Sequence, residues 1–152
     1  MPLSMFYTVG VCLDFLKKGL KELISTTDIK KACEKANIFI KKGDTVLFYT
    51  DHYRKHYGTD NWGSGPGITA EAAQWLGAKE ISAFGVETMS PGVPEISNKE
   101  VHYICGELGF THYENLKNLN LLIGKERFRF IGFPLKIRGG TGSPVRAVAI
   151  FE

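Results

Sequence analysis

The pattern of hydrophobic and polar positions along the chain predicts strands that alternate with helices. Several short segments are rich in β-branched and aromatic residues, and the segment at 45–50 (TVLFYT) is apolar on both faces, which predicts a buried strand. On this basis we expect strands at residues 9–15, 45–50, 80–86, 110–113, 127–137 and 145–151.

Helices are predicted where apolar residues recur at helical spacing after a residue that can cap a helix. The expected helices follow Ser25, Thr69 and the pair Ser97–Asn98, and end near Ala36, Leu76 and Leu108, with Gly77 and Gly109 as the stops of the last two. Residues 51–67 are polar, aromatic and glycine-rich, and we expect a long loop there.

This order of elements predicts an α/β fold. Strand–helix–strand units in the middle of the chain favour parallel pairing. The last two strands are joined by the glycine-rich segment 138–144 and are expected to pair antiparallel, which makes a mixed sheet. The sequence has 152 residues and no linker-like stretch, so we expect residues 1–152 to form one domain.

Composition narrows the class of protein. The chain is 43% hydrophobic with a formal net charge of +3, which excludes wholesale disorder, and no apolar run approaches the roughly 18–20 residues of a membrane span. Three scattered cysteines and the lack of a secretory signal predict a cytoplasmic protein with reduced thiols. The surplus of positive charge comes from lysines up to residue 42, but acidic residues interrupt them, which favours a solvated surface over binding to nucleic acid.

Histidines are the first candidates for chemistry. His52 and His56 are four residues apart, a spacing that zinc sites use on a helix, but their neighbours predict a loop, which favours surface or packed histidines. Residues 56–60 (HYGTD) are similar to a His-x-Gly-Thr-His metal motif in which Asp60 replaces the last ligand. His102 and Glu114 could converge where a helix meets the next strand, or be two ordinary polar residues.

Two other features favour structure over chemistry. The loop at 139–144 (GGTGSP) could cradle an anion, but it precedes a strand and lacks the lysine of a P-loop, so a tight connection is the better interpretation. Cys105 lies on a predicted apolar helix face, which favours burial over reactivity.

Several blocks of the sequence, taken together, resemble the cyclase family of metal-dependent hydrolases, which includes kynurenine formamidase and isatin hydrolase. These blocks occur in one order between residues 8 and 151. They are residues 42–47 (KGDTVL), 66–76 (PGITAEAAQWL), 84–90 (FGVETMS), His102 with 114–119 (ENLKNL), and 134–147 (PLKIRGGTGSPVRA). The family usually has Asp at the position of Glu87.

The resemblance implies a swivelling β/β/α-type fold, a divalent metal (zinc or manganese) and hydrolysis of a formamide, cyclic amide or lactone. It implies that His102 and Glu114 are metal ligands. The family's His-x-Gly-Thr-His-x-Asp-x-Pro-x-His motif has no counterpart in this sequence, so we expect an N-terminally shortened fold with an incomplete metal site.

Two hypotheses follow. In the first, the protein is a kynurenine formamidase-like hydrolase of a small molecule, with a third ligand from the loop at 51–60, such as Asp60, or from a partner chain; His52 and His56 are then the candidate catalytic residues. In the second, it is a non-catalytic relative that has lost the metal and acts as a binding or assembly module. Exposed sheet edges favour a homo-oligomer in either case.

Overall fold

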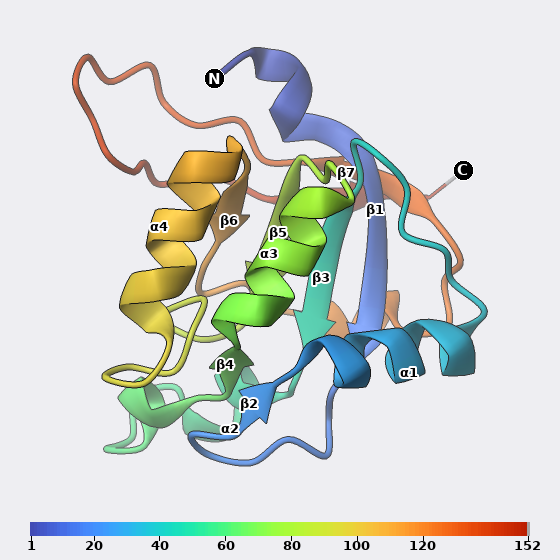
Figure 1. Ribbon diagram of the computed structural model, residues 1–152, viewed down its shortest axis with the longest axis vertical. Helices are drawn as coiled ribbons and strands as arrows, with labels where there is room; N and C mark the ends of the chain where they lie inside the picture. The colour runs from blue at the N-terminus through green and yellow to red at the C-terminus, as the bar shows by residue number, and fades with distance from the viewer. Residues whose placement is uncertain (152) are drawn as a thin grey trace.

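A computed structural model describes residues 1–151 and contains a six-stranded mixed sheet (Figure 1). The order of the strands is β6-β5-β3-β1-β7-β8. The parallel strands are β1 (Tyr7–Asp14), β3 (Thr45–Tyr49), β5 (Ala83–Val86) and β6 (Thr111–Tyr113). The antiparallel strands are β7 (Phe128–Ile131) and β8 (Val148–Ile150). The predicted α/β class and mixed sheet are confirmed.

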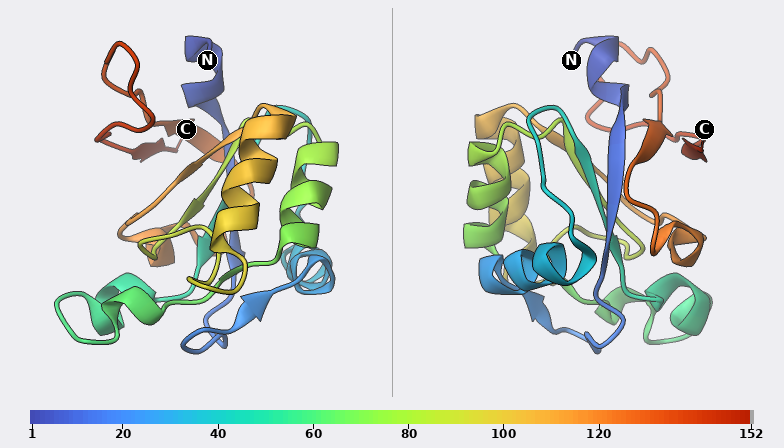
Figure 2. Two further views of the ribbon diagram at one scale, coloured as in Figure 1. Left: turned by 60° about the vertical axis from the view of Figure 1, so that its left-hand side comes forward. Right: turned by 90° about the vertical axis from the view of Figure 1, so that its right-hand side faces the viewer.

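Three long helices cover one face of the sheet: α1 (Thr26–Ala36), α3 (Ala70–Ala78) and α4 (Asn98–Leu108), as Figures 1 and 2 show. The core between them and the sheet includes the fully buried Phe48 and Phe84. The opposite face packs against the short 3-10 helices Leu3–Phe6 and Leu119–Leu122 in a second apolar cluster. None of the helices within residues 1–151 is long and apolar enough to cross a membrane.

Two of the three predicted helix caps are confirmed, whereas the side chain of Ser97 makes no capping hydrogen bond to α4. The Ser25 hydroxyl accepts a hydrogen bond from Asp28 N, and the Asp28 carboxylate accepts one from Ser25 N, which forms a capping box. Thr69 caps α3 through Ala72 N. Gly109 ends α4 in the left-handed conformation, with φ of 74°.

Gly77 does not end α3, contrary to the prediction, because the helix continues to Ala78. The reason lies in packing. α3 and α4 run side by side (Figure 1), and a side chain at position 77 would collide with Leu108. The glycine therefore allows close approach of two helices and is not a stop signal.

The prediction of one long loop at residues 51–67 was wrong. This segment holds α2 (His52–His56), a 3-10 helix (Trp62–Ser64) and β4 (Gly67–Ile68), which pairs with β2 (Leu23–Ile24). Aromatic contacts stabilise the five-residue helix: the rings of Tyr53 and Tyr57 stack with centroids 4.8 Å apart, and both pack edge-on against Trp62. Figure 2 shows the segment projecting from the end of the sheet at which β3 ends.

The last two strands are shorter than predicted. Regular pairing ends at Ile131 and resumes at Val148, in place of the expected strands at 127–137 and 145–151. Pro134 lies in the part of the first predicted strand that is not paired, and proline has no N–H with which to continue a ladder.

Candidate metal centre

Three side chains that can bind metals meet where α4 packs beside β6. His102 comes from α4, His112 from the middle of β6, and Glu114 follows the last residue of that strand. Alternation along β6 explains the arrangement: His112 faces the helices, where its ring lies near Phe84, whereas Tyr113 enters the cluster on the opposite face of the sheet. Glu114, two residues after His112, returns to the helix side.

The distances define a compact group. Glu114 Oε1 lies 3.3 Å from His112 Nε2 and 3.9 Å from His102 Nε2. The two imidazole rings are 4.6 Å apart between centroids and meet edge to face, at 82°. The side chain of His102 is 46% exposed, that of Glu114 31% and that of His112 16%, so the group opens to solvent on the side of α4.

Electrostatics favour a neutral imidazole at His102. Burial lowers its pKa, the neighbouring His112 lowers it further, and Glu114 acts in the opposite direction. A neutral imidazole offers a nitrogen lone pair to a metal, whereas a protonated one does not.

The donor set fits a divalent metal. One ligand atom from each of the three residues lies within 4.8 Å of the other two. Imidazole nitrogens with a carboxylate oxygen suit zinc and also manganese. The structure therefore brings His102 and Glu114 together and adds His112, which the sequence analysis did not select.

A signal for His112 is present in the sequence. On a strand, residues two apart share a face, so His112 and Glu114 belong on the same side of the segment at 110–113 as soon as that strand is predicted. The resemblance to the cyclase family implies only His102 and Glu114 as ligands.

The other candidates lie elsewhere. Asp60 is exposed and is not part of the group. His52 is buried, its Nε2 lies 2.9 Å from the carbonyl oxygen of Trp62, and its ring packs against His56 with centroids 4.9 Å apart. The two histidines do share a helix, α2, contrary to the expected loop, and they lie within its aromatic packing.

Cys105 is buried, as expected, and burial raises the pKa of its thiol to about 12. A thiol that stays protonated at neutral pH is a poor nucleophile, and this agrees with a structural role. The loop at 139–144 is exposed, and the Ser143 hydroxyl accepts a hydrogen bond from Leu135 N across it.

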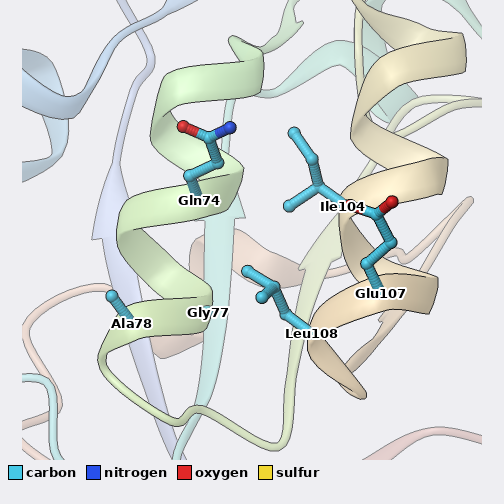
Figure 3. Close-up of a pocket in the computed structure, with 6 residues that line it drawn as sticks. All are labelled: Gln74, Gly77, Ala78, Ile104, Glu107 and Leu108. Atoms are coloured by element: carbon cyan, nitrogen blue, oxygen red, sulfur yellow. The ribbon is translucent and has the colours of Figure 1, made fainter.

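A separate hollow lies between α3 and α4 and has a volume of about 370 Å³. Its lining consists of Gln74, Gly77, Ala78, Ile104, Glu107 and Leu108 (Figure 3). Only Glu107 among these is ionisable, and none belongs to the group of His102, His112 and Glu114. The hollow therefore carries no chemistry comparable to that group.

A buried carboxylate lies at the end of β5. Glu87 is 3% exposed, and its Oε2 accepts hydrogen bonds from Thr50 N at 2.7 Å and from Thr50 Oγ1 at 3.0 Å. Burial raises the pKa of Glu87, the bonds from Thr50 lower it, and the charge of Asp51 raises it; the net direction is upward. The network ties the end of β5 to the start of the segment that holds α2.

Glu87→Gln is expected to stabilise the protein at neutral pH by on the order of 1 kcal/mol. An acid whose pKa is raised by folding adds stability below its ordinary pKa and loses it as the pH rises through the folded value. The glutamine amide keeps an oxygen that accepts hydrogen bonds from Thr50, and it never ionises. The variant therefore does not lose stability as the pH rises. Urea unfolding at pH 5 and pH 8 measures this, with the exposed Glu71→Gln as control. Equal pH dependence of wild type and variant would contradict it.

Comparisons with known proteins agree with one another. A model of the family described as "Putative cyclase" matches residues 1–93. Isatin hydrolase of Roseibium aggregatum is 30% identical over 142 residues, covering 85% of this chain and 53% of the relative. Isatin hydrolase A from Labrenzia aggregata, bound to benzyl benzoate, superposes with a TM-score of 0.88 at 26% identity, covering 100% of this chain and 64% of that one.

A third relative shares the fold. The structure of a potential metal-dependent hydrolase with cyclase activity superposes with a TM-score of 0.73 at 22% identity, covering 97% of this chain and 67% of that chain. The chain spans about half the length of the curated relative and just under two thirds of isatin hydrolase A. His102, His112 and Glu114 lie outside the residues matched by the family model.

Proposed function

Because the chain belongs to the cyclase family, whose hydrolase members it matches in sequence and fold, we propose that it is a metal-dependent hydrolase of a formamide, cyclic amide or lactone. The metal, zinc or manganese, is held by His102 and Glu114. The observation that carries the proposal is that these two side chains, 12 residues apart in sequence, lie together in a group compact enough to bind one metal ion. The name of the curated relative makes isatin the first substrate to test.

The residues of this chain have distinct roles in the proposed reaction. His102 contributes a neutral imidazole nitrogen and Glu114 a carboxylate oxygen, both at a position that solvent and substrate reach from the side of α4. A divalent metal, when bound, polarises the scissile carbonyl and makes a water molecule more acidic. In the reaction the C–N or C–O bond breaks, the carbonyl carbon gains the hydroxyl of water, and the leaving atom gains the proton.

Metal removal tests the proposal. We expect the chelated protein to hydrolyse neither isatin nor an aryl formamide, and Zn²⁺ or Mn²⁺ to restore turnover. Metal content by elemental analysis and product formation by absorbance measure the two parts. Glu107→Gln, which alters an exposed carboxylate outside the group, serves as the control and should keep activity. Bound metal without turnover of any of these substrates would instead favour a binding or assembly module.

We also propose that the protein is a homo-oligomer that pairs along β8. This strand is at the edge of the sheet, and Val148 and Ile150 are 40% and 48% exposed on it. An exposed apolar edge strand is a template for pairing with another chain. The double variant Val148→Lys, Ile150→Lys is expected to shift light-scattering mass to the monomer, whereas Phe39→Lys, exposed after α1, should not. A monomeric wild type would contradict the proposal.

A further inference from the structure

We propose that His112 is the third ligand of the metal, so that this chain alone supplies three protein ligands: His102, His112 and Glu114. This rests on the proposed function, because it concerns the same metal. It replaces the expectation that the third ligand comes from the segment at 51–60 or from a partner chain. Catalytic zinc sites take three protein ligands and keep one position open.

The surroundings of His112 indicate that its polar interactions lie on one side of the ring. The ring packs beside Phe84, with centroids 5.7 Å apart, and Nδ1 is buried with no hydrogen-bond partner among the described residues. A buried polar atom without a partner costs free energy, so the other ring nitrogen is the one available for a polar interaction. That nitrogen, Nε2, is the atom that lies next to Glu114.

The distance between the two atoms fits a pair of ligands to one metal. Two donors at 2.0–2.1 Å from a tetrahedral metal lie about 3.3–3.4 Å apart. His112 Nε2 and Glu114 Oε1 are 3.3 Å apart, which matches this spacing, and the pair is also within ion-pair distance. His102 Nε2, at 3.9 Å from the same oxygen, needs to approach by only about half an ångström to reach this spacing.

Coordination through Nε2 places the proton of the neutral ring on Nδ1. Metal-binding histidines almost always donate this proton to a hydrogen-bond acceptor outside the ligand set. His112 Nδ1 has no such acceptor among the described residues. Loss of such a partner lowers metal affinity by about 10–100-fold, so we expect a site that binds metal more weakly than a fully supported one.

Two variants of nearly equal size separate a ligand from a supporting hydrogen-bond donor. In His112→Gln, the amide can donate a hydrogen bond to Glu114 but is a poor ligand for zinc. In His112→Glu, the carboxylate can bind zinc but cannot donate to Glu114 when ionised. If His112 is a ligand, His112→Gln should lower Zn²⁺ affinity more than about 100-fold, beyond the range for a lost outer partner, and His112→Glu should lower it much less.

The experiment titrates the full metal-free chain with Zn²⁺ by calorimetry and with Cu²⁺ by pulsed electron paramagnetic resonance, which counts bound imidazoles. We expect two imidazoles in the wild type and one in His112→Gln, and His102→Gln serves as the matched ligand variant. Thermal unfolding of each metal-free variant checks the fold.

The outcomes are distinct. Wild-type affinity in His112→Gln, or the opposite order of the two variants, overturns the role of His112 and leaves the proposed function in place. A count of one bound imidazole in the wild type would also overturn the role of His112 and leave the proposed function in place. A wild type that binds neither ion overturns both proposals. If His112→Gln fails to fold, the imidazole count of the wild type decides alone.

Discussion

Glu114→Gln is expected to lower Zn²⁺ affinity more than about 100-fold, beyond the cost of a lost outer-shell partner, and to remove metal-dependent hydrolysis. Glu114 is the only carboxylate in the group, and its Oε1 lies within 4 Å of both imidazole Nε2 atoms. The amide has no negative charge to offset that of the cation. Since the Glu114 side chain is 31% exposed and its ion pairs with the two histidines are partly solvated, stability without metal should change by no more than about 1 kcal/mol.

Calorimetric titration with Zn²⁺ and urea unfolding without metal measure the two effects. The control is Glu107→Gln, which removes an exposed carboxylate from α4, the helix that carries His102, and should alter neither quantity. Unchanged affinity in Glu114→Gln would exclude this residue as a ligand. A large loss of stability without metal would show that its role is structural.

Phe84→Ala should destabilise the protein by about 3–5 kcal/mol, the range for removing a buried aromatic ring. Phe84 is fully buried in the middle of β5 and packs against Phe48 on β3 and Phe110 before β6. Its ring also lies beside His112, so the cavity left by alanine should weaken metal binding in whatever fraction stays folded.

Urea unfolding measures the stability of this variant, and Zn²⁺ titration at low temperature measures the second effect. Tyr103→Ala is the matched control, because Tyr103 is an aromatic residue that is 63% exposed on α4, next to His102. Its stability should stay within about 0.5 kcal/mol of the wild type. A Phe84→Ala protein as stable as this control would mean that the core collapses around the missing ring.

The fold was predictable where the signals are local. The side chains of Ser25 and Thr69 cap helices through bonds that span three residues, so the sequence nearby determines them. The helix at His52–His56 was not predictable in this way, because rings from both sides of a turn stabilise it. The role of Gly77 depends on Leu108, which is 31 residues away.

The candidate site was predictable only in part. The resemblance selected His102 and Glu114, and the structure places their ligand atoms 3.9 Å apart. That distance depends on how α4 packs beside β6, which no local pattern determines. The alternation of side chains along a strand predicts that His112 and Glu114 share a face. The proximity of His112 to His102, however, depends on the contact between helix and strand.

β6 is one of the two outermost strands of the sheet, is paired on one side alone, and is only three residues long. Short edge elements open at low free-energy cost and exchange their amide hydrogens early. A metal held by His102, His112 and Glu114 would join this strand to α4 and would bind only when both are in place. By mass action it would then stabilise the closed edge in proportion to the logarithm of its concentration. This edge of the sheet would in this way become sensitive to the supply of metal ions.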